Sequence, residues 1–137
     1  MKKIIVLAVS TSVLFLSGCT KQEDPKETGT KICQALQKMD FNELKKYTDE
    51  ESTKEIDAGQ KKLEEAKTQI AALPAEQRDS IQKVFDGQMA MVKQKMADIN
   101  CSNITVQDGS DKESKVVMID GKPTKLKLIE NKWKLTK

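Results

Sequence analysis

The hydrophobic period of this chain changes once, near Asn100, from about 3.6 residues to two. Before this point, apolar residues recur at the three- and four-residue spacing that is typical of helices with one apolar face. After it, short β-branched runs alternate with polar residues and are separated by the turn signals Asp108-Gly109 and Asp120-Gly121. Helices first and antiparallel strands last predict the α+β class.

The helical part divides into four expected segments. Residues 32–39 predict a first helix, and a break at residues 40–42 leads into a short second one. A third helical pattern starts at Asp57 and is interrupted by Pro74, because proline cannot continue the hydrogen-bond ladder in mid-helix. Proline is well suited to the start of a helix, so a fourth helix is expected over residues 75–99.

The expected helix over residues 75–99 has the strongest periodic signal. Met89 lies beside its main face and Met91 leans away from it. Methionine at helical spacing is more often core filler than a contact surface, so we expect this face to pack in the core. The face consists of Ile81, Val84, Phe85, Gln88, Val92, Met96 and Ile99.

The strand part predicts an antiparallel meander of three or four strands with one apolar face. The expected strands cover residues 104–106, 115–119, 124–128 and 133–135. An apolar sheet face needs a cover, and the upstream helices supply one. The expected architecture is therefore a set of N-terminal helices packed on a C-terminal three- to four-stranded sheet.

The start of the chain resembles the signal sequence of bacterial lipoproteins. Lys2-Lys3 precede an apolar stretch over residues 4–16, and the small pair Ser17-Gly18 stands directly before Cys19. The apolar stretch is shorter than the about 20 residues that a membrane-spanning helix needs, which favours cleavage. The resemblance implies a signal peptide over residues 1–18 and a Cys19 that carries diacylglycerol and further fatty acyl chains such as palmitate. The alternative is an ordinary secretory peptide that leaves the thiol unmodified.

The segment after the signal is polar, carries mixed charge and contains Pro25 and Gly29. We therefore expect a lipidated cysteine and flexible tether over residues 19–30 and a single α+β domain over residues 31–137. By resemblance to enteric lipoproteins, Thr20 favours the outer membrane, with the domain facing the periplasm. In a bacterium with one membrane, the domain would lie on the outer face of the cytoplasmic membrane.

The charge of the chain is nearly balanced. Without Lys2-Lys3, 22 basic residues stand against 21 acidic ones, and the two signs are interspersed, which argues against a nucleic-acid partner. A local exception is the C-terminal segment, where a solvated polar face is favoured over contact with an anionic surface. Its lysines are Lys122, Lys125, Lys127, Lys132, Lys134 and Lys137.

Cys33 and Cys101 are the two cysteines outside the proposed lipidation site. An exported chain enters an oxidising compartment, where two remaining cysteines most economically pair with each other. The bridge would close a loop of about 69 residues and stabilise the fold by on the order of 4 kcal/mol. A reactive or metal-binding pair is disfavoured, because the chain has no Cys-x-x-Cys spacing and no histidine.

The residue types argue against catalysis. Without histidine there is no imidazole base and no Ser-His or Cys-His pair. The adjacent carboxylates Asp49-Glu50-Glu51 and Glu64-Glu65 point in different directions, and the glycines form no phosphate-binding pattern. We expect no catalytic residue, no metal and no cofactor, and hence not an enzyme.

Both ends of the mature chain resemble small bacterial lipoproteins with a nuclear-transport-factor-like or cystatin-like fold. Residues 32–47 are similar to their opening, in which a helix with Ala35-Leu36 leads into a second helix. Residues 125–135 are similar to their closing hairpin, with Glu130-Asn131 at the turn and Trp133 in the last strand. The resemblance implies an α+β domain of that fold.

Two function classes follow, and both act by binding. The first is a membrane-anchored, non-catalytic binding module for a protein or small ligand of the cell envelope. The alternative is an immunity, inhibitor or exclusion lipoprotein that neutralises a toxin or hydrolase. The partner and the oligomeric state stay open. The residues expected nearest a pocket or contact surface are Phe85, Met89, Leu126, Leu128 and Trp133.

Overall fold

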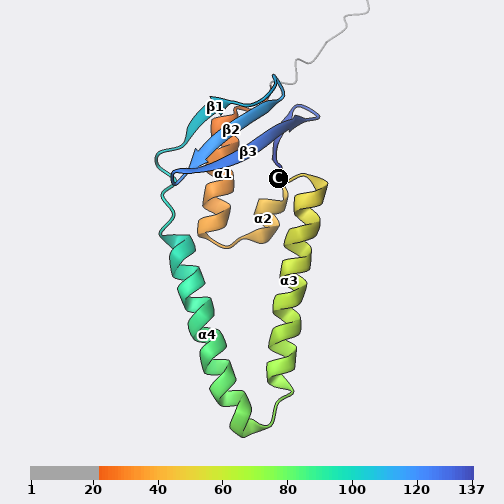
Figure 1. Cartoon of the computed structure of the whole chain (residues 1–137), viewed down its shortest axis with the longest axis vertical. Helices are drawn as coiled ribbons and strands as arrows, with labels where there is room; N and C mark the ends of the chain where they lie inside the picture. The colour runs from red at the N-terminus through yellow and green to blue at the C-terminus, as the bar shows by residue number, and fades with distance from the viewer. Residues whose placement is uncertain (1–21) are drawn as a thin grey trace, which may run out of the picture.

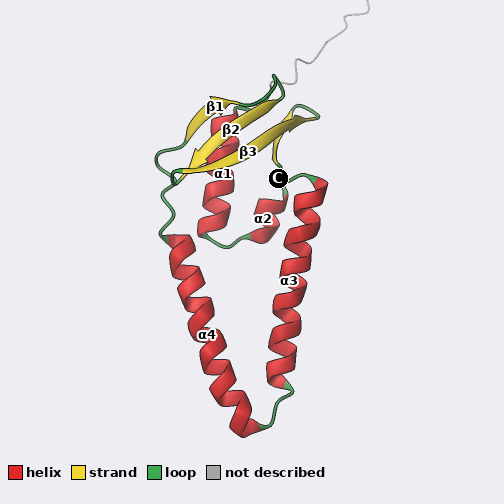
Figure 2. Ribbon diagram, viewed as in Figure 1, coloured by secondary structure: helices red, strands yellow, loops and turns green. Residues whose placement is uncertain are grey.

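The computed structural model of the protein describes residues 22–137, which form four helices followed by four strands (Figures 1 and 2). This order confirms the predicted α+β class. The helices are α1 (Pro25–Gln37), α2 (Phe41–Lys45), α3 (Glu50–Ala71) and α4 (Ala75–Ala97). The strands are β1 (Thr105–Asp108), β2 (Ser114–Ile119), β3 (Lys122–Ile129) and β4 (Lys132–Leu135).

The strands form one antiparallel sheet in the order β1-β2-β3-β4, as a meander requires. The segment after α2 continues the sheet beyond β4, where Thr48 forms a parallel bridge with Leu135. The Leu135 amide donates to the Tyr47 carbonyl at 2.7 Å, and the Asp49 amide donates to the Leu135 carbonyl at 3.0 Å. The backbone groups on this edge of the sheet are therefore partly paired.

Helix α1 lies against one face of the sheet and forms the core with it. Trp133 on β4 is 1% exposed, and its indole Nε1 donates to the Glu23 carbonyl at 2.8 Å. This bond fastens the last strand to the residues that precede α1. The buried cluster contains Ile32, Cys33 and Ala35 from α1, Leu44 from α2, and Ile104, Val117, Ile119, Leu126 and Trp133 from the strand region.

Helix α1 begins inside the predicted tether, so a flexible segment over residues 19–30 is wrong for the residues from Pro25 onward. The Asp24 side chain accepts from the Lys26 amide at 2.9 Å and caps a helix whose first position is proline. A Cβ atom on Gly29 would lie 2.4 Å from Cγ1 of Val117. The glycine therefore permits α1 to approach the sheet closely.

Helices α3 and α4 form a hairpin that projects away from the sheet (Figure 1). The two helices meet at the turn over residues 72–74 and diverge toward the rest of the molecule. At the base of the hairpin, α3 contacts α2 and the end of α4 contacts α1. Asp49 caps α3 by accepting from the Ser52 amide at 2.7 Å, so this helix starts well before Asp57.

Helix α4 lies entirely in the described range and contains no buried residue. The prediction that its apolar face belongs to the core is therefore wrong for the residues of α4, whereas Ile99, which follows the helix, packs against the core cluster. The sheet is covered by α1, and the strands are too short to cover a helix of this length as well. A 23-residue helix is about 35 Å long, whereas the eight residues of β3, the longest strand, span about 27 Å.

Candidate functional site

The apolar residues of α3 define the inner side of the hairpin. Ile56, Leu63 and Ile70 recur every seven residues, and they are half-buried except for Ile70, which is buried near the turn. On α4, Phe85 and Met89 are also half-buried. Apolar residues at this spacing are typical of helices that pack side by side. Ile70 is therefore the buried residue of this row near the turn, whereas Ile56, at the base of the hairpin, packs against the core cluster.

Helix α4 also carries apolar residues that nothing covers. Four of them lie on one side of the helix, within about 100 degrees of arc at the usual 100 degrees per residue. We call them the outer stripe: Ile81, Val84, Met91 and Val92 are 45%, 61%, 59% and 40% exposed. Single exposed apolar side chains are ordinary, whereas a contiguous row on one helix marks an interaction surface.

Small and uncharged residues border the outer stripe on one side. Ser80, Gly87 and Gln94 follow each other at seven-residue spacing, next to Val84 and Met91 on the helix surface, and all three are exposed. A Cβ atom on Gly87 would meet nothing within 4 Å. A second helix can therefore approach α4 closely along this border.

The carboxylates of α3 are engaged in separate surface ion pairs. Glu64 pairs with Lys67 at 2.7 Å, and its neighbour Glu65 pairs with Lys61 at 3.8 Å. The two carboxylates thus form no shared acidic site, as their adjacency in sequence indicates. Exposed pairs of this kind contribute little to stability, and they give α3 a solvated outer side.

The C-terminal residue connects the sheet to the start of α3. The Lys137 ammonium lies 2.7 Å from Glu51 Oε1 and 2.6 Å from Glu55 Oε1. Hydrogen bonds to these two carboxylates raise the pKa of Lys137 above its ordinary value. This contact holds the base of the hairpin next to the end of the chain.

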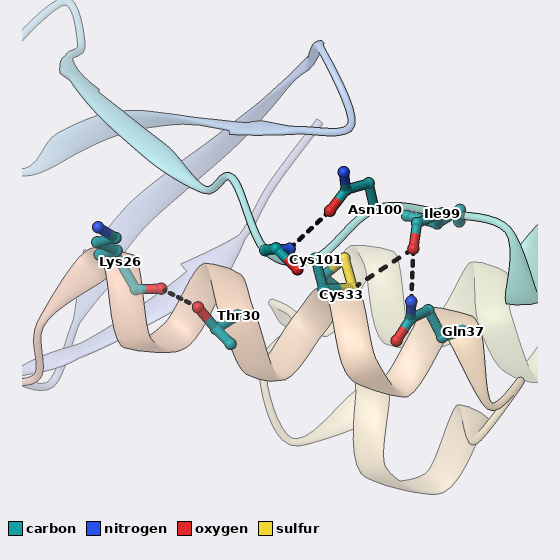
Figure 3. The surroundings of a disulfide bond; sticks show 8 residues. Lys26, Thr30, Cys33, Gln37, Ile99, Asn100 and Cys101 are labelled. Atoms are coloured by element: carbon teal, nitrogen blue, oxygen red, sulfur yellow. Dashed lines mark hydrogen bonds between the residues drawn. A yellow bond between two sulfur atoms is a disulfide. The ribbon is translucent and has the colours of Figure 1, made fainter.

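Cys33 and Cys101 form the predicted disulfide, which joins α1 to the segment after α4 (Figure 3). The sulfur atoms are 1.97 Å apart, and the Cα atoms are 5.7 Å apart. Close by, the Gln37 side-chain amide donates to the Ile99 carbonyl. The base of α4 is therefore fixed to α1 by a covalent bond and a hydrogen bond.

The five residues predicted to lie nearest a pocket are not brought together. Leu126 and Trp133 are buried in the core, and Leu128 is half-buried opposite Trp133. Phe85 and Met89 lie on the projecting hairpin. The expected pocket between the fourth helix and the sheet is therefore not formed by these residues.

Two apolar hollows lie instead at the base of the hairpin. The first has a volume of about 220 Å³ and is lined by residues of α1, the end of α4 and the sheet, including Leu36, Met96 and Ile119. The second has a volume of about 250 Å³ and is lined by residues around α2 and α3, including Phe41 and Ile56. Both are small for ligand pockets, and apolar side chains make up most of their lining.

Within residues 22–137, no group of three or more potential metal ligands is close enough to hold an ion. Over the same residues, none of the helices combines the length and the apolar character that crossing a membrane requires. Cys19 and the predicted signal peptide over residues 1–18 lie outside the described residues.

No protein-family model, curated protein or solved structure matches this chain. The outer stripe is the feature that sequence reasoning missed as a surface. The signal that would have found it is the length of the two long helices, which exceeds what so small a sheet can cover. The candidate functional site is therefore the outer stripe and its border on α4.

Proposed function

We propose that this protein is a lipid-anchored, non-catalytic binding module of the bacterial envelope, and that α4 contacts a helix of another envelope protein. The observation that carries the proposal is the outer stripe of four exposed apolar side chains on a helix without a buried residue. Lipidation at Cys19, implied by the resemblance of residues 1–19 to lipoprotein signals, supplies the anchor.

The dimensions of the outer stripe support a helical partner. It extends from Ile81 to Val92, which corresponds to about 17 Å along the helix axis. This is the size of the contact that one amphipathic helix makes with another. The uncharged border with Gly87 permits close approach, whereas a flat protein surface would need a wider apolar area.

The proposed location and fold have their own support. The disulfide between Cys33 and Cys101 is typical of chains that reach an oxidising compartment. We therefore propose an outer-membrane lipoprotein facing the periplasm or, in a single-membrane bacterium, one on the outer face of the cytoplasmic membrane. Packing of α1 on the sheet supports a nuclear-transport-factor-like or cystatin-like fold with N-terminal helices on the meander.

Site-specific crosslinking in cells tests the binding role. A photoreactive amino acid is placed at Val84 or Met91 in the full chain, and at Lys62 or Thr68 as matched exposed positions on α3. We expect one dominant adduct with an envelope protein at the two α4 positions and none at the α3 positions. A toxin or hydrolase in that adduct would assign the protein to the immunity or inhibitor class.

Two outcomes would overturn the proposal. An adduct of twice the protein's own mass would show that the outer stripe joins two copies of this chain. Equal labelling at all four positions, or no adduct at any, would show that α4 is not a specific contact surface.

The double variant Val84→Lys with Met91→Lys should abolish the adduct formed from a crosslinker at Gln88. The far-UV circular dichroism should stay unchanged, because both side chains are exposed.

A further inference from the structure

The sheet face opposite α1 carries an uncompensated group of lysines. Strand residues alternate between faces, so the buried positions Leu126 and Trp133 place their neighbours on the opposite side. We call this group the lysine face: Lys125, Lys127, Lys132 and Lys134. Lys127 lies directly opposite Lys134, so the group continues across two strands.

None of these four lysines forms an ion pair within the described residues. The Lys134 ammonium donates to the Lys46 carbonyl at the edge of β4, and the other three side chains are exposed. By contrast, Lys115 on β2 is neutralised by Asp108, 2.5 Å away. Four lysines without an ion-pair partner therefore lie together on one face of the sheet.

The remaining residues of this sheet face are uncharged. Their side chains share the alternation of the lysines. The carboxylates nearby belong to turns at the rim, namely Asp111 and Glu113 before β2, Asp120 between β2 and β3, and Glu130 after β3. The pKa of Asp111 is lowered chiefly by a hydrogen bond from the Ser114 hydroxyl, and Lys127 adds a smaller electrostatic contribution. The uncharged residues are Thr105, Gln107, Ser114, Val116, Met118, Pro123 and Ile129.

The length of chain before the described residues limits where this face can lie. Glu23 is held by the indole of Trp133, and Cys19 precedes it by four residues. Four extended residues span at most about 14 Å. A lipid on Cys19 therefore holds the sheet end of the molecule at the membrane surface, within about one or two Debye lengths at physiological salt.

We propose that the lysine face docks on anionic phospholipid headgroups of the membrane that holds the anchor. The hairpin turn lies at the opposite end of the molecule from the sheet, so the turn is not part of the docked face (Figure 1). Each lysine near an anionic membrane surface strengthens binding about fivefold, and the charge complementarity therefore favours this occupant. The inference rests on the proposed lipidation of Cys19 and is independent of the partner of α4.

Lysine labelling on membranes tests the docking. The mature lipoprotein, produced from the full chain, is reconstituted in nanodiscs of phosphatidylcholine alone or with about 30% phosphatidylglycerol, and acetylation of each lysine is followed by mass spectrometry. We expect Lys125, Lys127 and Lys132 to react several-fold more slowly on the anionic discs and to lose this protection in high salt. Exposed lysines on α3, such as Lys62, should react equally on both discs.

A charge-matched pair of variants completes the test. The first carries Lys125→Gln, Lys127→Gln, Lys132→Gln and Lys134→Gln; the second carries the same change at Lys61, Lys62, Lys67 and Lys93 on the hairpin. Docking should slow amide hydrogen exchange of the β3–β4 backbone on anionic discs relative to neutral discs. This additional protection should vanish in the first variant and persist in the second.

Equal labelling on the two kinds of disc, or protection that survives in the first variant, would overturn the docking proposal. The mass of the purified mature chain reports the lipid separately. A chain without acyl mass would refute the anchor, which belongs to the proposed function, whatever the lysines do.

Discussion

Helices α1 and α4 both carry apolar residues at helical spacing, but their surroundings are opposite. Helix α1 has 13 residues, of which five are buried, whereas α4 has 23 residues and none buried. The difference arises because α1 is short enough to lie on the sheet and carries Gly29 at the point of closest approach. The comparison shows that helical periodicity identifies an apolar face but does not identify what the face will contact.

The two regions should differ in stability as well as in burial. The α1–sheet region contains nearly all of the buried apolar cluster, while the hairpin contributes Ile70 as its buried apolar residue. Regions with few buried contacts open at lower free energy than the core. A substitution in the α1–sheet region should therefore lower stability more than a comparable substitution in the hairpin.

Truncation of the core tryptophan should have the largest effect. Trp133→Ala removes a fully buried side chain and its hydrogen bond to Glu23. We expect the free energy of unfolding to fall by about 3–5 kcal/mol, measured by urea denaturation. Met91→Ala on the hairpin is the control and should change it by less than about 0.5 kcal/mol. Similar losses in both variants would contradict the division into a packed region and an exposed one.

Removal of the disulfide should have the second-largest effect on stability. Cys33→Ala combined with Cys101→Ala should lower the free energy of unfolding by about 2–4 kcal/mol, because the bridge constrains the unfolded chain over a sequence separation of 68 residues. Amide exchange should increase most at the end of α4, which loses its covalent link to α1. A reducing agent should destabilise the parent protein and leave this variant unchanged; insensitivity of the parent protein would show that the bridge does not form.

Replacing glycine with alanine should change the stability of the protein in opposite directions in the two regions. Gly29→Ala places a methyl group 2.4 Å from Val117 and should destabilise the protein by about 1–3 kcal/mol. Gly87→Ala meets open space and should stabilise α4 by about 0.5–1 kcal/mol through helix propensity. Thermal unfolding measures both, and Val117→Ala should partly rescue the first variant. Stabilisation by both changes would show that α1 does not approach the sheet so closely.

The pH dependence should be the smallest effect. Hydrogen bonds from Lys46, Lys54 and Lys115 lower the pKa values of Glu43, Glu50 and Asp108, respectively. Because these folded pKa values are lowered, the associated stability is present at neutral pH and is lost as pH falls through the acidic range.

These pairs are exposed, so the decline below about pH 5 should be shallow. With no histidine in the chain, unfolding midpoints should stay constant between about pH 6 and 8. A steep transition in that interval would require a titrating group that the described residues do not supply.

The sheet could be predicted from the sequence because its signals are local. Asp108-Gly109 and Asp120-Gly121 mark turns between β-branched runs, and the observed strands agree with the expected ones to within a few residues. The pairing of Cys33 with Cys101 followed from composition and compartment. None of these features depends on how distant elements are arranged.

The start of α1 and the surroundings of α4 depend on distant contacts and were therefore missed. Pro25 and Gly29 are typical of linkers when read locally, yet one begins a helix and the other packs against Val117. The residues of the outer stripe are typical of a core, and their exposure follows from the limited area of a four-stranded sheet. The candidate site could thus be predicted as an apolar face but not as a surface.

The disulfide also sets the route by which mechanical force crosses the molecule. A pull between the N-terminal end of the chain and α4 passes along α1 to Cys33, through the sulfur–sulfur bond to Cys101, and from there back into α4. Neither the sheet nor α3 lies on this covalent path. A load applied to α4 is therefore carried by one helix and one covalent bond, and the hydrogen-bond ladders of the sheet are not required to resist it.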